Sequence, residues 1–321
     1  MDNKLLTIII PAYNMQEYLS RSVDSLITAI DQLDIIIVND GSTDDTIKIA
    51  NKYQKKYPKS ITVVNKGNAG HGSAINAGIA LAKGKFLRVL DADDWFDDKD
   101  LPEYLENLAK TPADLVITEY SRNSLKESER VSFTEFKPAT VLELDELLKL
   151  PAKEQVAFAA IHSITVRTKK YQKAAPLLEK TFYEDQEFVA KALLVSENFV
   201  FYPLNIYQYF IARAGQSISP DKQFAHREDH ARVLQKLTEL YADCNDDVKK
   251  ELTKRRIQET IKTHYWIYYY NSKTNKRREY RALLKTLKPE MKDIEAEIKP
   301  AFRLRLFIGR NKNKIIRRKN G

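Results

Sequence analysis

The stretch that decides the fold is FLRVLDADD at residues 86–94, where a mostly apolar run leads directly into carboxylates. A short apolar run bounded by polar residues is typical of a buried strand. Similar runs at 6–10, 34–38 and 61–64 are also predicted to be strands, and the segments between them have helical patterns. This alternation predicts an α/β fold with a mostly parallel sheet flanked by helices.

Polar residues follow each of the four predicted strands. The strand ends read PAYN (11–14), NDGS (39–42), NKGN (65–68) and DADD (91–94). In an open α/β sheet the carboxyl ends of the strands form the ligand-binding edge, so these four segments are expected to converge. The glycine fingerprints of dinucleotide-binding folds and of P-loops are missing from the sequence. Neither of those nucleotide sites is predicted.

The 321 residues are enough for one large domain with an appendage. From about Pro220 the composition becomes helical and charged, which places a domain boundary near residue 219. We therefore expect an α/β domain over 1–219, a helical region over 220–300 and a basic tail over 301–321.

The charge of the chain lies mainly in its tail. The net charge is +9, but residues 301–321 hold eight Lys and Arg and no Asp or Glu, so residues 1–300 carry only +1. A nucleic-acid-binding body would spread positive charge over a face, so no nucleic-acid partner is expected. The single cysteine, Cys244, excludes an internal disulfide, and the short apolar start predicts no signal peptide. These features indicate a cytoplasmic protein.

Two carboxylates separated by one residue, Asp91 and Asp93, follow the fourth strand. Such a pair can bind a divalent cation that bridges a diphosphate. A solvated loop that caps the next helix is the alternative, and spacing alone does not decide between them. His226 and His230 also stand four residues apart, but without the usual glutamate spacing of a metalloprotease they are interpreted as part of a charged helix surface.

Four motifs together resemble the family-2 glycosyltransferases: IIIPAYN (8–14), IVNDGSTD (37–44), AINAG (74–78) and LDADD (90–94). The resemblance covers residues 4–110 in order. It implies the GT-A fold, a nucleotide-diphosphate sugar donor that is usually UDP-linked, a Mg or Mn ion, and inversion at the anomeric carbon. Residues 1–110 would then form the nucleotide-sugar half and 111–219 the acceptor half.

The resemblance assigns the nucleoside to the first two strand ends. Pro11, Ala12, Tyr13 and Asn14 resemble the loop under the nucleobase and ribose. Asp40 resembles the carboxylate that accepts from the uracil N–H, a role that suits a group with acceptors only. A simple turn residue before glycine is the alternative for this aspartate.

The resemblance assigns the diphosphate to the next two strand ends. The family's uridine and diphosphate loop is similar to 66–76, where Lys66, Gly70, His71 and Asn76 are the candidate contacts. For His71 a surface or turn position is the alternative. The family's Asp-x-Asp motif is similar to the stretch with Asp91, Ala92 and Asp93, in which Asp91 touches ribose or metal, Asp93 ligates the metal, and Asp94 could share that duty.

An inverting displacement needs a base on the face opposite the leaving group. Glu184 and Asp185 resemble the family's Glu-Asp motif, in which the aspartate is the base. A capping box from Thr181 to Glu184 at the start of a helix is the alternative. Arg213, in a segment that closes the site in relatives, is a candidate for contacting diphosphate or acceptor, or else a solvated loop residue.

The interleaved basic and apolar tail predicts peripheral association with the inner face of a membrane. Each Lys or Arg near an anionic leaflet contributes about 1 kcal/mol. A solvated, disordered terminus is the alternative.

The sequence thus predicts a metal-dependent inverting transferase that moves a hexose or N-acetylhexosamine from a UDP-sugar to a hydroxyl. The acceptor is expected to be a glycan, a lipid-linked or a protein-linked molecule in cell-surface polysaccharide or glycoconjugate synthesis. A non-catalytic nucleotide-sugar or glycan-binding scaffold and a sugar nucleotidyltransferase are the alternatives. The latter class usually opens with a glycine-rich basic loop, whereas this chain has PAYN at 11–14.

Overall fold

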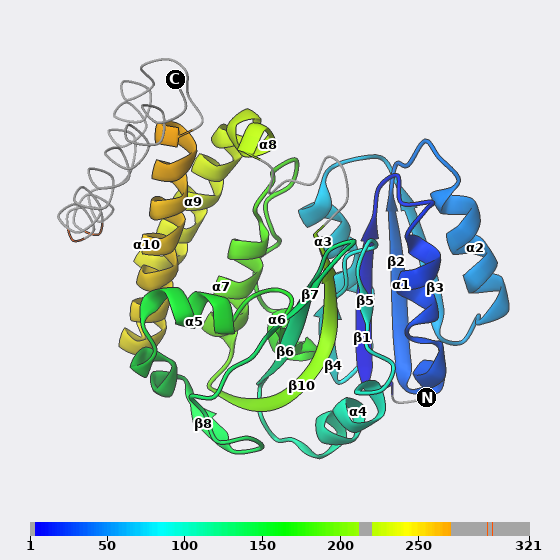
Figure 1. Cartoon of the computed structure of the whole chain (residues 1–321), viewed down its shortest axis with the longest axis horizontal. Coiled ribbons are helices and arrows are strands. Elements are labelled where there is room, and N and C mark those ends of the chain that lie inside the picture. The colour runs from blue at the N-terminus through cyan, green and yellow to red at the C-terminus, as the bar shows by residue number, and fades with distance from the viewer. Residues whose placement is uncertain (1–3, 212–219, 271–293, 295–296, 298–321) are drawn as a thin grey trace.

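The computed structural model describes residues 4–211, 220–270, 294 and 297, and its centre is one mixed sheet (Figure 1). The strands are β1 (Leu6–Ala12), β2 (Leu33–Asp40), β3 (Ile61–Lys66), β4 (Phe86–Val89), β5 (Trp95–Phe96), β6 (Leu115–Asn123), β7 (Ser128–Val131), β8 (Val141–Glu143), β9 (Ile164–Arg167) and β10 (Asn198–Phe210). Their order is β3-β2-β1-β4-β9-β6-β10-β5, with β7 paired to β6 and β8 paired to β10.

Helices flank this sheet and continue beyond it. They are α1 (Leu19–Asp24), α2 (Thr46–Lys56), α3 (His71–Leu81), α4 (Leu101–Lys110), α5 (Ala152–Phe158), α6 (Thr168–Tyr171), α7 (Asp185–Val195), α8 (Pro220–Ala225), α9 (Arg227–Asp243) and α10 (Asp247–Tyr270), with 3-10 turns η1 (Ile27–Gln32) and η2 (Leu144–Lys149). Over the described ranges, no helix combines the length and apolar character needed to span a membrane.

Strands β1 to β4 form the parallel half of the sheet. β1 pairs in parallel with β2 and β4, and β2 pairs in parallel with β3. All residues of β1, β2 and β4 are buried, which explains their nearly continuous apolar sequences. β9 then runs antiparallel between β4 and β6, so the sheet is mixed. The predicted α/β class is confirmed, and the first strand ends share one edge.

One predicted helix is broken in the structure. The apolar residues between 19 and 30 suggest a single helix, but the chain forms α1 and then η1. The interruption occurs at Ser25, whose Oγ donates to the carbonyl of Ser22 (2.7 Å) and accepts from the N–H of Phe96 (3.1 Å). Contact with β5 therefore ends the helix where the local pattern would continue it.

The polar residues at 121–130 suggest a loop, but in the structure they form a hairpin. β6 continues to Asn123, and β7 pairs with it in antiparallel fashion from Ser128. Ser124 Oγ accepts from the N–H groups of Lys126 (3.2 Å) and Glu127 (2.9 Å) and closes the turn. Hydrogen bonds between main-chain groups form this hairpin, although its side chains are polar. The sequence therefore lacks the alternation of apolar and polar residues that would identify strands.

The helical region expected after residue 219 packs directly on the first part of the chain. Apolar residues of α9 and α10, including Val233 and Ile257, share a buried cluster with Ala190 of α7. Arg256 of α10 is buried and donates to the carbonyl of Ala159 (2.7 Å). The expected boundary near 219 and the tail at 301–321 fall outside the described residues.

Close packing of α3 on β1 depends on Gly78. A Cβ there would lie 2.4 Å from Ile9 Cγ2, a buried strand side chain. We expect Gly78→Ala to lower the free energy of unfolding by about 1–3 kcal/mol through overpacking, as measured by urea denaturation. Gly67→Ala is the matched control, because nothing lies within 4 Å of its Cβ position. Equal unfolding midpoints for both variants would contradict this account of the contact.

Candidate functional site

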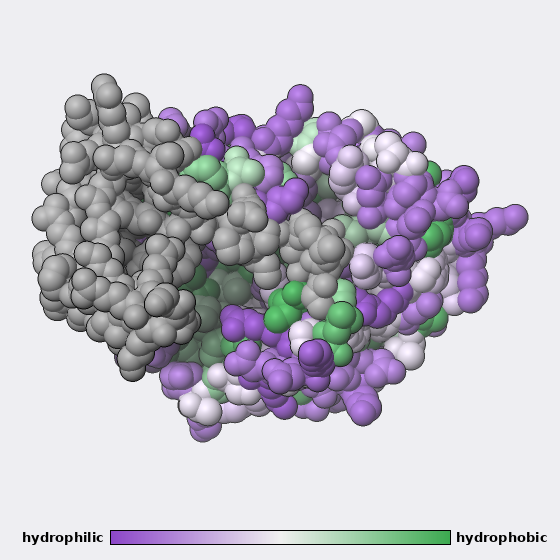
Figure 2. All heavy atoms as spheres, turned by 45° about the horizontal axis from the view of Figure 1, so that its top comes forward, coloured by the Kyte–Doolittle hydropathy of each residue, from purple (hydrophilic) through white to green (hydrophobic). Residues whose placement is uncertain are grey.

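The loops after β1 and β2 are joined at the carboxyl edge of the sheet. Pro11 and Ala12 still belong to β1 and are buried, whereas Tyr13 is 48% exposed. Asn14 adopts a left-handed conformation (φ 54°), and its Oδ1 accepts from the N–H of Thr43 (2.8 Å). Figure 2, which tilts this edge forward, shows a mostly hydrophilic surface on the right and hydrophobic residues toward the centre.

Asp40, at the end of β2, organises the glycine-rich loop of residues 67–72. Its Oδ1 accepts from Lys66 Nζ (2.7 Å) and from the N–H of Ala69 (3.0 Å), and its Oδ2 accepts from the N–H of Gly70 (2.8 Å). Gly70 has φ 90°, and a Cβ there would lie 3.2 Å from the nitrogen of Lys180. Lys66, predicted to face phosphate, is thus paired with Asp40, a contact that the motif alone does not indicate.

His71 connects the end of β4 to the start of α7. Its Nε2 lies 2.9 Å from Asp91 Oδ1, and its Nδ1 lies 2.5 Å from Glu184 Oε1. Burial lowers the pKa of the imidazole, but the two carboxylates outweigh this effect and raise the pKa well above its ordinary value. His71 is therefore a cation at neutral pH that bridges Asp91 and Glu184, the latter 113 residues further along the chain than His71 itself.

Asp185 stands at the beginning of α7, as the sequence predicts. Burial and the neighbouring charge of Glu184 raise its pKa to about 6, against the opposing effects of Gln186, Arg256 and His71. Gln186 Nε2 donates to Asp185 Oδ2 at 2.9 Å, and Arg256 donates in turn to Gln186 Oε1 at 2.9 Å. A carboxylate with a pKa near 6 suits a general base at neutral pH.

Three carboxylates, which we call the acidic cluster, follow β4: Asp91, Asp93 and Asp94. Burial, together with the charges of Asp91 and Asp93, raises the pKa of Asp94 well above its ordinary value. Its oxygens accept from Tyr207 Oη (2.6 Å) and from the N–H of Phe210 (2.7 Å). A buried carboxylate that is crowded by two others is a site where a divalent cation would be stabilised.

The candidate ligand group differs in part from the predicted one. Among the described residues, Asp91, Asp94 and His162 bring ligand atoms within 4.8 Å of one another, whereas the sequence nominated Asp91 and Asp93. The main-chain carbonyl of Asp93 accepts from Arg21 Nη2 (2.6 Å). Ala92 is buried in the core between them, so only its main chain can meet a ligand.

The sequence alone suggests a structural role for His162, a lone histidine, because only the antiparallel insertion of β9 brings it near β4 and the acidic cluster. Its ring stacks on Tyr209 with centroids 4.3 Å apart. Burial lowers the pKa of His162 to about 4, so the ring is neutral at pH 7, the form that binds metals.

Comparison with known proteins agrees with this geometry. The profile of Glycosyl transferase family 2 matches residues 7–173, just over half of the chain. The chain belongs to glycosyl transferase family 2. It is therefore a glycosyltransferase, and the resemblance seen in the sequence motifs is confirmed.

Individual relatives match this chain either over a shorter segment or over most of its length at lower sequence identity. Chondroitin synthase of Pasteurella multocida is 42% identical over 95 residues, which cover 29% of this chain and only 10% of that protein. The crystal structure of S. aureus TarS 1–349 in complex with UDP has a TM-score of 0.67 at 20% identity and covers 87% of this chain and 79% of that one. The mannosyltransferase PcManGT from Pyrobaculum calidifontis, in complex with GDP-Man and Mn²⁺, has a TM-score of 0.53 at 12% identity, covering 94% and 83%. At these identities both structures support the fold.

In this family-2 glycosyltransferase, a buried ion pair fixes the segment that leads to Asp185. Lys191 Nζ lies 2.6 Å from Glu187 Oε1 and donates to the carbonyls of Ala175 and Pro176 (2.8 and 2.9 Å). Glu187 Oε2 accepts from the N–H of Leu178 (2.9 Å). Glu187 and Lys191 of α7 thus both bond to the main chain of residues 175–178 and fix this segment against the helix.

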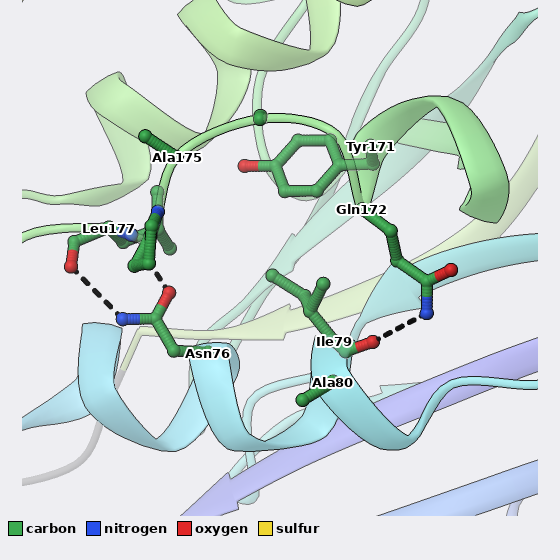
Figure 3. A pocket seen from close by; sticks show the side chains of 9 residues that line it. Asn76, Ile79, Ala80, Tyr171, Gln172, Ala175 and Leu177 are labelled. Carbon is green, nitrogen blue, oxygen red and sulfur yellow. Dashed lines mark hydrogen bonds between the residues drawn. The ribbon is translucent and has the colours of Figure 1, made fainter.

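Asn76, predicted to contact the donor, is engaged elsewhere. Its Nδ2 donates to the carbonyl of Leu177 (3.0 Å) and its Oδ1 accepts from the N–H of the same residue (2.8 Å) (Figure 3). α3 begins at His71, so Asn76 falls in the helix and turns toward the 171–177 segment. Its side chain ties α3 to that segment.

A cavity of about 450 Å³ lies beside this contact, between α3 and residues 171–177 (Figure 3). At its other end Gln172 Nε2 donates to the carbonyl of Ile79 (2.9 Å). The lining contains no charged side chain. The cavity therefore does not suit a nucleotide diphosphate, and the site remains at the carboxyl edge. Arg213 lies outside the described residues.

The raised pKa of His71 predicts a pH-dependent contribution to stability. This contribution is complete below the ordinary pKa of 6.5 and is lost as the pH rises through the raised pKa of the folded protein. We expect His71→Gln, which keeps a donor and an acceptor but no charge, to lose more unfolding free energy at about pH 6 than at about pH 9. Urea denaturation at both pH values checks this. The same loss at both would show that His71 is not a bridging cation.

Proposed function

We propose that this glycosyltransferase is metal-dependent and inverting, and transfers a hexose or N-acetylhexosamine from a UDP-sugar to a hydroxyl of a glycan, lipid-linked or protein-linked acceptor. The observation that carries the proposal is the His71 bridge, which holds the acidic cluster and the Glu184–Asp185 pair on either side of one imidazole. One side suits a leaving diphosphate and the other suits proton removal. Cell-surface polysaccharide or glycoconjugate synthesis is the proposed setting.

The nucleoside is proposed to bind at the first two strand ends, with the exposed ring of Tyr13 against the base and Pro11 and Ala12 beneath it. The TarS structure contains UDP, which supports a uridine donor. Lys66 and the N–H groups of Ala69 and Gly70 donate to Asp40, the Ala69 N–H to both oxygens. The N–H of uracil is proposed to join these donors at the same carboxylate.

The metal is proposed to bind at the acidic cluster. Asp91 and Asp94, with His162, offer two oxygen-bearing groups and one neutral imidazole, a donor set that fits a divalent cation. When bound, the ion supplies positive charge to the departing diphosphate. A nitrogen ligand favours Mn²⁺ over the harder Mg²⁺. Asp93 remains a proposed ligand from the family motif.

Asp185 is proposed to take the proton of the acceptor hydroxyl as that oxygen attacks the anomeric carbon. Glu184 holds His71 through Oε1, while its Oε2 is buried without a hydrogen-bond partner in the described part of the chain. A buried acceptor of this kind is costly unless a ligand donates to it. We assign Oε2 of Glu184 to a hydroxyl of the bound sugar.

The domain roles are part of the same proposal. Residues 1–110 would bind the nucleotide sugar, 111–219 the acceptor, and 220–300 would support the acceptor side. The basic tail at 301–321 is proposed to attach the enzyme to an anionic membrane surface, on the strength of its charge.

Substitution of the proposed base tests the chemistry. Asp185→Asn should lower transfer by about 10²–10⁴-fold while UDP binding, measured by calorimetry, is unchanged. In the wild type, kcat/KM should fall as the pH drops below about 6, because protonated Asp185 cannot accept a proton. UDP release and product formation across pH measure both effects. Full activity of the Asn variant would remove Asp185 from this role.

Metal dependence can be tested separately from turnover. Asp91→Asn and His162→Ala should each weaken Mn²⁺ binding by about tenfold or more, as measured by electron paramagnetic resonance titration. They should also lower UDP release from the preferred UDP-sugar. Asp98→Asn, which alters an exposed carboxylate between β5 and α4, is the control and should bind Mn²⁺ normally. Unchanged Mn²⁺ affinity in both test variants would place the ion elsewhere.

A further inference from the structure

The short segment before Asp185 has an unusual main-chain conformation. Lys180 (φ 49°) and Tyr183 (φ 71°) both lie in the left-handed region, which side-chain-bearing residues rarely adopt. The N–H of Lys180 donates to the carbonyl of Ala69 (2.7 Å), and Arg232 of α9 donates to the carbonyl of Lys180 (3.0 Å). Contacts from two other parts of the chain thus stabilise a strained turn next to the proposed base.

This conformation directs two consecutive aromatic rings differently. Tyr183 packs against His230 (4.8 Å between centroids) and the apolar cluster of α9 and α10. His230 is buried against His264, so the charged-surface interpretation of this histidine is wrong. Phe182, by contrast, is 44% exposed. Tyr183 packs against the core, whereas packing of the core does not require an aromatic residue at Phe182.

The ring of Phe182 packs on the ring of His226, the residue that precedes α9. Their centroids are 3.8 Å apart and their planes are inclined by 35°. Asp229 Oδ2 lies 3.0 Å from His226 Nδ1. Since the carboxylate accepts, a proton is assigned to Nδ1, and in that tautomer Nε2 is an acceptor. The pair therefore offers an apolar aromatic face beside a hydrogen-bond acceptor.

The aromatic pair lies close in sequence to the proposed base, at the side of the molecule where the donor is proposed to bind. Phe182 precedes Asp185 by three residues, and α8, which leads into His226, lies at the top of Figure 1 with the loops that follow β1 and β2. Glu184 of the same turn contacts His71, which in turn contacts Asp91 of the acidic cluster. The short turn that carries the proposed base therefore also carries the exposed ring of Phe182.

We propose that Phe182 and His226 form a binding surface for a sugar ring of the acceptor, and that the acceptor is accordingly a glycoside whose hydroxyl reaches Asp185. The C–H face of a pyranose packs on the exposed ring of Phe182, and a ring hydroxyl donates to His226 Nε2. This inference rests on the proposed transferase function and narrows its acceptor to a carbohydrate.

Binding of simple glycosides tests the inference without knowledge of the natural acceptor. The probes are methyl β-D-glucopyranoside, methyl N-acetyl-β-D-glucosaminide and methyl α-D-mannopyranoside, added to the full-length protein with UDP and Mn²⁺ and observed by saturation-transfer NMR. We expect the wild type to bind at least one of them. Phe182→Ala and His226→Ala should weaken that binding by about tenfold, and Phe182→Trp should retain it.

Two controls separate a binding role from a structural one. UDP affinity and the urea midpoint should be unchanged in Phe182→Ala, because Tyr183 and not Phe182 enters the core. Leu125→Ala, which removes another exposed apolar side chain (82% exposed) from the β6–β7 turn, should leave glycoside binding unchanged.

The outcomes distinguish this inference from the function on which it rests. If the wild type binds UDP but none of the three glycosides, or if Phe182→Ala binds them as well as the wild type, the inference is overturned and the transferase proposal stands. Failure of the wild type to bind UDP overturns both.

Discussion

The site depends on one cation placed between carboxylates that would otherwise repel one another. His71 lies between Asp91, which belongs to the acidic cluster, and Glu184, which adjoins Asp185. Without its charge, Glu184 would be a buried carboxylate with no compensating partner at that oxygen, an arrangement that proteins avoid. The loop geometry and the position of α7 both assume this central charge, which also limits the rise in the pKa of Asp185.

Small residues allow that cation to reach both partners. A Cβ at Gly72 would lie 2.3 Å from the carbonyl oxygen of Leu178, so α3 can approach the 175–185 segment only with glycine there. Gly78, six residues further along α3, permits a similar approach to β1. Asn76 and the Glu187–Lys191 pair then fix the segment on its other sides. Helix α3 is thus the element that aligns the two halves of the site.

Local patterns were sufficient for the parallel half of the fold and for the residues at its strand ends. Strands β1 to β4 are fully or partly buried apolar runs, and the polar residues behind them, such as Asp40 and Asp91, need only the rule that parallel strands end at one edge. Such reasoning does not predict that His162 and Tyr207 lie at the acidic cluster, because β9 and β10 bring them in from distant sequence. The resemblance treats residues 66–76 as one loop, which predicts a donor contact for Asn76. In the structure α3 begins at His71, so Asn76 lies in a helix. The polar β6–β7 hairpin lacked the alternation that identifies strands.

Arg256 links the C-terminal helix α10 to the proposed base, which limits how the chain can be split into separate parts. It is a fully buried cation on α10, its pKa is lowered to about 10 by that burial, and it bonds Gln186 beside Asp185. The acidity of the proposed base therefore depends in part on a residue some seventy positions further along the chain. A chimera that joins residues 1–219 to a foreign C-terminal region would keep every motif of the family and still lack the charge that tunes its base. Any chimera of this enzyme therefore has to retain α10 together with residues 1–219.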